Sequence, residues 1–325
     1  METIGFTKNM KLIKPSFEII EQKPRDIVIP SDMEIGPKMA RQELIDTVYR
    51  QIEIAGRTCY KSEDKITPDS AAKFVERMVK SGHGAMLEHG TVYLKNENSC
   101  DDELKKYLDN KYSTYKSVYA GKRKCQDDTD YYYSEYVTTN FRVLVENNWL
   151  NDLKYICEPT EHHEKRITVR FVCDRGVSHE FVRHRVFSFA QESTRYCNYS
   201  KDKFGNECTF IIPSWLNYEE QQFVSKNDFS CSIRTDLSEH EYFIDLLLES
   251  ERTYNYLTQY CDWKPQQARA ILPNSLKTEL VMTGTIEQWE GFFKLRDAGS
   301  AHPQAYELAH PLHEEFIKRG WTKNN

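Results

Sequence analysis

Apolar side chains recur at helical spacing at several places along the chain. Leu44, Val48 and Ile52 follow one another four residues apart, which predicts an amphipathic helix. A second apolar stripe occupies residues 67–82, where Thr67 is the expected N-cap, a proline takes the first helical position and a glycine is the expected stop. Further helices are expected at 140–149, 242–260, 285–296 and 304–318.

Alternation with a period of two predicts the strands. It is clearest at residues 167–173, where we expect one buried face. Other strands are expected at 17–20, 26–29, 91–94, 131–137 and 276–282. Helices and strands do not alternate regularly, which favours an α+β fold with a mostly antiparallel sheet flanked by helices. We expect one domain over residues 1–325 with two polar insertions, at about 96–165 and 217–240, the first of them starting as a partly helical surface excursion.

Composition and charge exclude several classes of protein. With 44 Lys and Arg against 50 Asp and Glu, the net charge of −6 is unsuited to a general nucleic-acid coat, so we expect no nucleic-acid partner. No apolar run approaches the roughly 20 residues that span a bilayer, so no membrane partner is expected. Residues 1–30 also lack the apolar stretch of a signal peptide.

The cysteines and histidines do not form a recognisable metal-binding pattern. Nine cysteines are scattered without a C-x-x-C pair, which is typical of reduced cysteines in a cytoplasmic protein. The adjacent His162 and His163 lie in a charged stretch, where neighbouring side chains point apart. His302, His310 and His313 are expected in surface or packing roles. We therefore expect no bound metal.

The densest candidate chemistry lies in residues 183–196. Three arginines, a histidine, two serines, a glutamine and a glutamate are interleaved there with apolar side chains that should be buried. Arginine and serine together suit phosphate, because the guanidinium fork binds two oxygens and the hydroxyl a third. The alternative is a structural network in which the arginines pair with Glu180 and Glu192.

These residues carry a resemblance to a known family. Arg183-His184-Arg185, seven further residues and then Ser193 resembles the signature of the flavin-dependent thymidylate synthases. The order and approximate spacing of motifs agree over about residues 41–310. The other segments similar to family motifs are 55–60, 81–89, 268–273 and Leu295-Arg296.

The resemblance implies an enzyme that reductively methylates dUMP to dTMP. Methylenetetrahydrofolate would be the one-carbon donor, NADPH the reductant, and FAD the flavin through which the methylene group and the hydride pass. Members of the family use no cysteine nucleophile, and they are homotetramers with active sites shared among subunits. Two alternatives stay open: an enzyme of the same fold that forms 5-hydroxymethyl-dUMP, and a catalytically silent nucleotide- or RNA-binding homologue.

The resemblance also implies residue roles. The residues matched to flavin contacts are His83, Arg183, His184, Arg185, Val186 and Gln191. Those matched to the nucleotide are Glu180, Arg183, Gln191, Glu192, Ser193, Thr194, Arg195, Arg269 and Arg296. Ser193, Arg195 and Arg269 suit the phosphate and Gln191 the deoxyribose. Arg296 is the catalytic candidate, because a fixed cation beside the uracil ring lowers the energy of a developing pyrimidine anion.

The chain departs from the family at one flavin-side motif. An Asn-x-Arg-x-x-x-Asn run is common there, whereas this chain has Thr285, Glu287 and Gly291. A glutamate in place of the arginine reverses the charge near an anionic cofactor. Either the adenosine end of FAD is held differently, or the inserted segments contribute. Glu180 also stands where glutamine is common.

Overall fold

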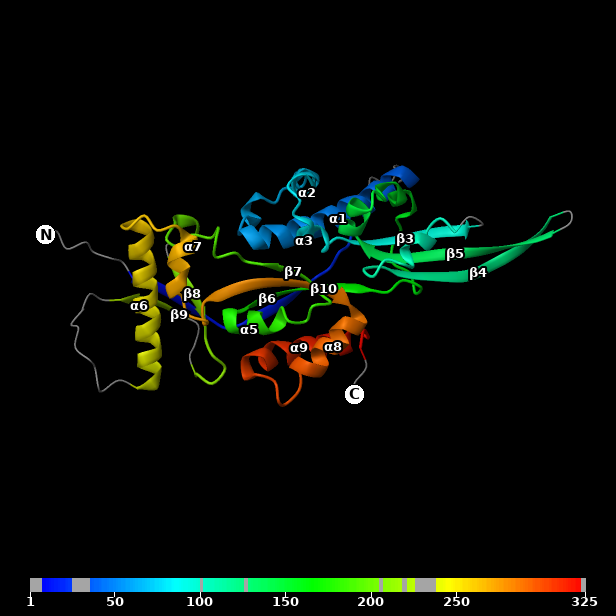
Figure 1. Ribbon diagram of the computed structural model, residues 1–325. Helices are drawn as coiled ribbons and strands as arrows, with labels where there is room; N and C mark the ends of the chain where they lie inside the picture. Colours follow the sequence, from blue (N-terminus) through cyan, green and yellow to red (C-terminus); the bar gives the residue numbers. More distant parts are fainter. Residues whose placement is uncertain are drawn as a thin grey trace, which may run out of the picture.

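The computed structural model describes residues 8–24, 36–99, 102–125, 128–204, 207–217, 221–225 and 238–322. The strand expected at 26–29 lies outside the described residues, as does much of the insertion expected at 217–240. Within the described residues the chain is α+β, as predicted, with three small sheets in place of a single one (Figure 1).

The central sheet is fully antiparallel. Its strands, in spatial order, are β2 (Ser16–Ile20), β6 (Arg166–Asp174), β10 (Lys277–Thr285) and β7 (Ser188–Gln191). The strand predicted at 167–173 is confirmed, and so is its more deeply buried face, since Ile167, Val169, Phe171 and Cys173 lie in one core while Arg170 and Val172 are half-buried. Thr168 is the exception, because it is buried on the other face, where its hydroxyl bonds to that of Thr283.

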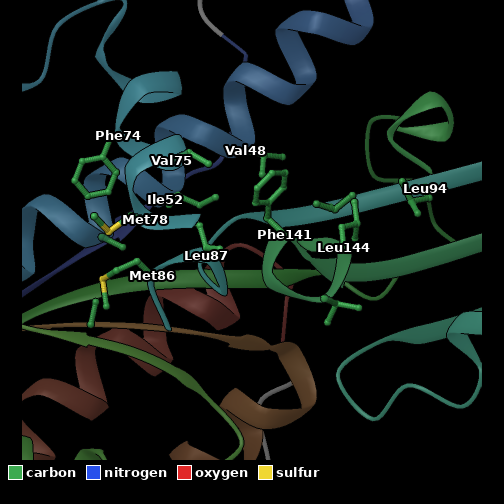
Figure 2. Close-up of a cluster of buried hydrophobic side chains, with 14 of the residues drawn as sticks. Val48, Ile52, Phe74, Val75, Met78, Met86, Leu87, Leu94, Phe141 and Leu144 are labelled. Carbon is green, nitrogen blue, oxygen red and sulfur yellow. The ribbon is translucent and has the colours of Figure 1, made fainter. Parts of the chain in front are cut away.

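One face of the central sheet is covered by the helices from the first half of the chain. Helices α1 (Pro37–Tyr60) and α3 (Gly84–Leu87) lie on the sheet. Helices α2 (Ser70–Lys80) and α4 (Phe141–Glu146) pack on them, next to the short 3-10 turns η1 (Glu63–Lys65) and η3 (Leu150–Tyr155). Val48 and Phe74 belong to one buried cluster (Figure 2). Ala190 and Val281 of the sheet are part of the same cluster. The predicted apolar stripes at 44–52 and 67–82 therefore form this core.

The other face of the central sheet is covered by one helix from the segment before Arg183 and by two helices from the C-terminal part of the chain. They are α5 (Arg175–Phe181), α8 (Ile286–Arg296) and α9 (Pro303–Lys318). Leu280 and Met282 pack here with Trp289, whereas Val281 between them points to the opposite core, as strand geometry requires. Figure 1 shows α1 and α3 on one side of β7 and β10, and α8 and α9 on the other.

A second layer stands beside the central sheet. It contains β1 (Lys8–Ile13), β8 (Cys208–Ile211), β9 (Gln221–Ser225), the 3-10 turn η4 (Asp202–Phe204), α6 (Glu239–Gln259), α7 (Pro265–Ala268) and the 3-10 turn η5 (Arg269–Ile271). β1 pairs in parallel with β8 and antiparallel with β9. Helix α6 begins at Ser238, whose side chain forms a capping box with Glu241.

A long hairpin projects from the molecule (Figure 1, right). Strands β3 (Thr91–Ser99), β5 (Asp128–Asn140) and β4 (Thr114–Cys125) form the third sheet, joined through the 3-10 turn η2 (Lys105–Tyr107). The expectation of a partly helical excursion is met only at η2, and most of this segment is strand. Cross-strand aromatic contacts such as Tyr119 against Tyr133, 6.0 Å apart, stabilise the pairing.

Across the described residues, no helix has both the length and the apolar character needed to cross a bilayer.

Candidate functional site

Three of the predicted site residues meet at the end of α8. Arg296, the last residue of that helix, donates from Nε to His184 Nε2 at 3.1 Å and from Nη2 to the backbone oxygen of Glu180 at 3.0 Å. Its Nη1 also forms an ion pair with the Glu180 carboxylate. These residues are more than 110 positions apart in sequence, so the fold alone brings them together.

His184 is an acceptor in this contact and is neutral at pH 7. Burial and, after it, the nearby charge of Arg296 lower the pKa of His184 to about 4. Since Nε2 accepts from Arg296, the ring proton is on Nδ1. The ring also packs against Phe292, with centroids 5.0 Å apart. Three of the five N–H donors of Arg296 are thus bonded to His184 and Glu180, and these bonds hold the guanidinium in place.

A second group of predicted residues lies where β7 ends. The backbone N–H of Ser193 donates to the carbonyl of Cys59 at the end of α1, at 3.1 Å. Arg269 Nη1 donates to Thr194 Oγ1 at 3.2 Å. Arg269 and Arg195 are exposed, whereas Thr194 is buried. Hydroxyls backed by exposed guanidinium groups match the chemistry expected of a phosphate site.

Gln191 and Glu192 point in different directions, as adjacent strand residues do. The amide of Gln191 donates to Ser178 Oγ at 2.9 Å and to Thr278 Oγ1 at 3.3 Å. Glu192 is buried, and its carboxylate accepts from Lys277 at 2.9 Å. Glu192 also accepts from the hydroxyl of Tyr199 at 2.9 Å. Glu180 and Glu192 therefore form separate ion pairs with Arg296 and Lys277, and among the described residues neither carboxylate pairs with an arginine of residues 183–196.

His83 contacts an aromatic side chain that sequence reasoning left without a role. The hydroxyl of Tyr60, the last residue of α1, lies 2.9 Å from His83 Nδ1. The Tyr60 ring also lies 5.8 Å from the ring of Tyr196. Tyr60 thus connects the predicted flavin loop to the predicted nucleotide segment. The only signal in sequence was its position at the end of a family-like segment.

The two groups of residues are held by different helices. His83 precedes α3, and Ser193 bonds to the end of α1, and both helices pack on β7. Arg296 ends α8, which packs with α9. Among the described residues, no hydrogen bond or ion pair joins Arg296 to Ser193, Thr194 or Arg195.

Arg185 and Val186 line a cavity of about 670 Å³. The volume is in the usual range for small-molecule sites. Thr285 and Glu287, at the beginning of α8, line the same cavity, so the segment that departs from the family motif faces the signature. The remaining wall is formed by residues at the base of the hairpin, among them Lys111, Ser113 and Arg142. Arg183 is exposed.

The side chains around this cavity are suitable for a flavin dinucleotide. Guanidinium, ammonium and hydroxyl groups are the donors that bind a diphosphate, and all three kinds are present. Arg166, at the beginning of β6, is one of them, and it was not among the residues predicted from sequence. It follows Lys165 at the end of a charged stretch, so nothing in the sequence marked it.

Comparisons with known proteins identify the family. The family described as thymidylate synthase complementing protein matches residues 157–319, which is half of the chain. A flavin-dependent thymidylate synthase of Pyrococcus furiosus is 27% identical over 193 residues, covering 58% of this chain and 70% of that protein. Proteins of the same name from Corynebacterium aurimucosum and Corynebacterium diphtheriae are 23% and 24% identical, each covering 79% of this chain and about 70% of their own length. The chain belongs to the family of the flavin-dependent thymidylate synthases.

Proposed function

We propose that this enzyme converts dUMP to dTMP, with methylenetetrahydrofolate as one-carbon donor, FAD as cofactor and NADPH as reductant. The observation that carries the proposal is the contact of Arg296 with His184 and Glu180. It joins the C-terminal arginine expected at the uracil ring to the Arg183-His184-Arg185 signature. The identity to relatives supports the family, and the side-chain chemistry supports the reaction.

The phosphate of dUMP would be bound by the segment after β7. Ser193 offers a hydroxyl, and Arg195 and Arg269 offer guanidinium groups that are exposed to a ligand. The amide of Gln191 is oriented by Ser178 and Thr278, which suits it to the deoxyribose. A charged hydrogen bond of this kind contributes about 1.5–3 kcal/mol to binding.

Arg296 would stabilise negative charge on the uracil. Its position at the end of a packed helix and its bonds to Glu180 and His184 hold the guanidinium in place before substrate arrives. Fixed charges stabilise a transition state more than mobile ones, because no reorganisation is needed during the reaction. The neutral state of His184 matters here, since an imidazolium would repel the guanidinium.

The flavin, when bound, supplies the hydride chemistry that amino-acid side chains lack. His83, Arg185 and Val186 would hold it, with Arg183 and His184 beside them. Arg185 and Val186 line the cavity of about 670 Å³, and His83 lies at the beginning of α3. The role of these residues is to bind and orient the cofactor.

We also infer a homotetramer with composite sites in the cytoplasm. Arg296 and Ser193 are held by different helices without a bond between them, which supports a site that draws the two residues from different chains. Closed symmetric assemblies are the common form of oligomers. If the site is composite, mixing inactive Arg269→Ala and Arg296→Ala proteins should restore about a quarter of wild-type activity, because random exchange leaves one site in four intact. A lack of recovery after demonstrated exchange would place both residues on one chain.

The proposed reaction is tested by identifying the product. The purified chain should show the oxidised-flavin absorbance band or acquire it when FAD is added. Incubation with dUMP, methylenetetrahydrofolate and NADPH should then yield dTMP, detected by mass spectrometry. Accumulation of 5-hydroxymethyl-dUMP would replace the proposed reaction with its variant. A chain that binds dUMP but neither binds flavin nor turns over would be a binding protein.

A further inference from the structure

The cavity beside the signature joins two parts of the chain that the family motifs do not connect. Arg185 and Ser188 line it from the signature side, and Thr285 and Glu287 line it from the beginning of α8. Lys111 lines it from the segment that precedes the hairpin strand β4. The inserted segment thus forms a wall of the same cavity that the signature faces.

Arg166 is a cation in this cavity without an anionic partner. Its guanidinium donates to Glu88 O at 3.2 Å, Thr91 Oγ1 at 3.3 Å and Ser188 Oγ at 3.3 Å, all neutral oxygens. No carboxylate among the described residues lies within ion-pair distance of it. Burial lowers the pKa of Arg166, and the nearby Tyr93, Glu88 and Glu164 offset this effect only in part. An anionic ligand would supply the missing compensation.

Arg142, which lines the same cavity, differs from Arg166 in having carboxylate partners. It is paired with both Glu88 and Glu146, at 2.6 and 2.7 Å, so its charge is already balanced. Arg185 and Lys111 are exposed, and neither has an ion-pair partner among the described residues. Arg166, Arg185 and Lys111 therefore stay available to a ligand.

The acidic groups of the cavity determine which anion fits. Glu88 and Glu146 share one cation, Arg142, whereas Glu164 and Glu287 have no ion-pair partner among the described residues. A ligand that is only anionic would be repelled by these two carboxylates. A ligand with a diphosphate and sugar hydroxyls suits both the cations and the carboxylates of this cavity. The diphosphate would pair with the cations, and the carboxylates would accept hydrogen bonds from ribose, as they do in dinucleotide sites.

We propose that this cavity holds the adenosine diphosphate half of FAD, with Arg166, Arg185 and Lys111 on the diphosphate and Glu287 accepting from the adenosine. The proposal rests on the proposed function. It gives the role of the absent Asn-x-Arg-x-x-x-Asn run to Arg166 of β6 and Lys111 of the inserted segment. Glu287 stands where the family motif has its arginine, and it would accept hydrogen bonds from the ribose hydroxyls of the adenosine.

The test is a binding titration on the full-length chain freed of flavin. FAD, ADP and riboflavin are each titrated and followed by calorimetry, since riboflavin lacks the diphosphate and adenosine. Arg166→Gln should weaken FAD and ADP by about 10- to 100-fold, the range for a lost charged hydrogen bond, and riboflavin by less than about threefold. Arg170→Gln is the matched control, because Arg170 lies on the same strand and pairs with Glu18 at the surface. It should leave all three affinities unchanged.

Two exposed positions keep the test decisive if Arg166→Gln does not fold. Lys111→Gln and Arg185→Gln should each weaken FAD and ADP by about 3- to 30-fold, a smaller loss because the exposed charges are screened. Lys116→Gln is the control for Lys111, since Lys116 lies in β4 outside the cavity lining. Circular dichroism melts establish which variants are folded.

The outcomes separate this proposal from the proposed function. A wild-type chain that binds no flavin in any form overturns both. A wild-type chain that binds FAD and riboflavin, with FAD affinity unchanged in the folded Arg166, Arg185 and Lys111 variants, overturns the cavity assignment and leaves the function standing. Loss of NADPH binding with FAD binding intact in those variants overturns it as well, because the cavity would then belong to the reductant.

Discussion

Replacing Arg296 with alanine separates a catalytic role from a structural one. The guanidinium makes three hydrogen-bonded contacts in the folded chain, to the Glu180 carboxylate, the Glu180 carbonyl and His184. Its side chain is 17% exposed and that of Glu180 27%, so the ion pair is partly shielded from water. A structural role alone would account for all of these contacts, and the two readings differ only in what happens to turnover.

The expected loss of stability is modest. A partly exposed ion pair contributes up to about 1 kcal/mol, the hydrogen bond to the Glu180 carbonyl about 1 kcal/mol, and a cation at a helix C-terminus about 0.3–1 kcal/mol. We expect Arg296→Ala to lose about 2 kcal/mol in all, seen as a fall in Tm of about 3 °C. The expected loss in kcat is far larger, about 10²–10³, comparable to removing one donor from an oxyanion hole.

The assay measures dTMP formation, flavin content and thermal stability on the same preparations. FAD content and NADPH oxidation without dUMP should survive in Arg296→Ala, because neither step involves the uracil ring. Arg296→Lys should recover little turnover, since an ammonium cannot reproduce the planar fork that contacts both Glu180 and His184.

Arg319→Ala is the matched control, because Arg319 also ends a helix and pairs with two carboxylates, Glu315 and Glu21. It should lower the stability slightly and leave kcat unchanged. Near-normal turnover in folded Arg296→Ala would remove Arg296 from the mechanism and leave the structural role alone.

Three further predictions follow from single contacts. Ser193→Ala should weaken dUMP binding by about 10- to 100-fold with FAD content unchanged, and equal affinity in a calorimetric titration would exclude Ser193 from the phosphate site. Gly56→Ala should destabilise the fold by about 1–3 kcal/mol in denaturant titrations, since a Cβ there would lie 2.4 Å from the Phe74 ring; a variant as stable as the wild type would show that the ring can move. The pKa of Glu279 would be raised by burial but is lowered to about 2 by two neighbouring lysines, so its stabilisation is complete above pH 4.5 and is lost as the pH falls towards 2. Glu279→Gln should flatten that part of the stability–pH curve, and an unchanged slope would contradict the assignment.

Local patterns in the sequence determined the elements of the two main cores. The stripe through Val48 and Ile52 and the alternation at 167–173 depend only on side-chain periodicity, and both predicted elements are confirmed. Thr285 was also identifiable as a helix cap, because capping depends on residues three positions apart. The ordered family motifs likewise pointed to the signature residues without any knowledge of contacts.

The strands expected at 91–94 and 131–137 are confirmed within β3 and β5, but β4 was not expected, because the stability of this hairpin is not local. Its strands carry many charged and polar residues, which favoured a surface excursion, and pairing between β4 and β5 supplies the backbone hydrogen bonds that the composition does not reveal. Similarly, the alternation at 167–173 predicted the buried face of β6 but not the burial of Thr168, which bonds to Thr283 more than a hundred positions away. A strand's own pattern does not record what packs on its second face.

The sequence by itself determined the family, the α+β class and the residue types of the site, because these depend on local order and on motif spacing. Only the tertiary structure decided that Arg296 is held by His184 and Glu180, and that Arg166 faces the cavity without a carboxylate partner. Contacts of this kind join residues that are tens to more than a hundred positions apart. They are fixed by the packing of helices on a sheet, which no short stretch of sequence specifies.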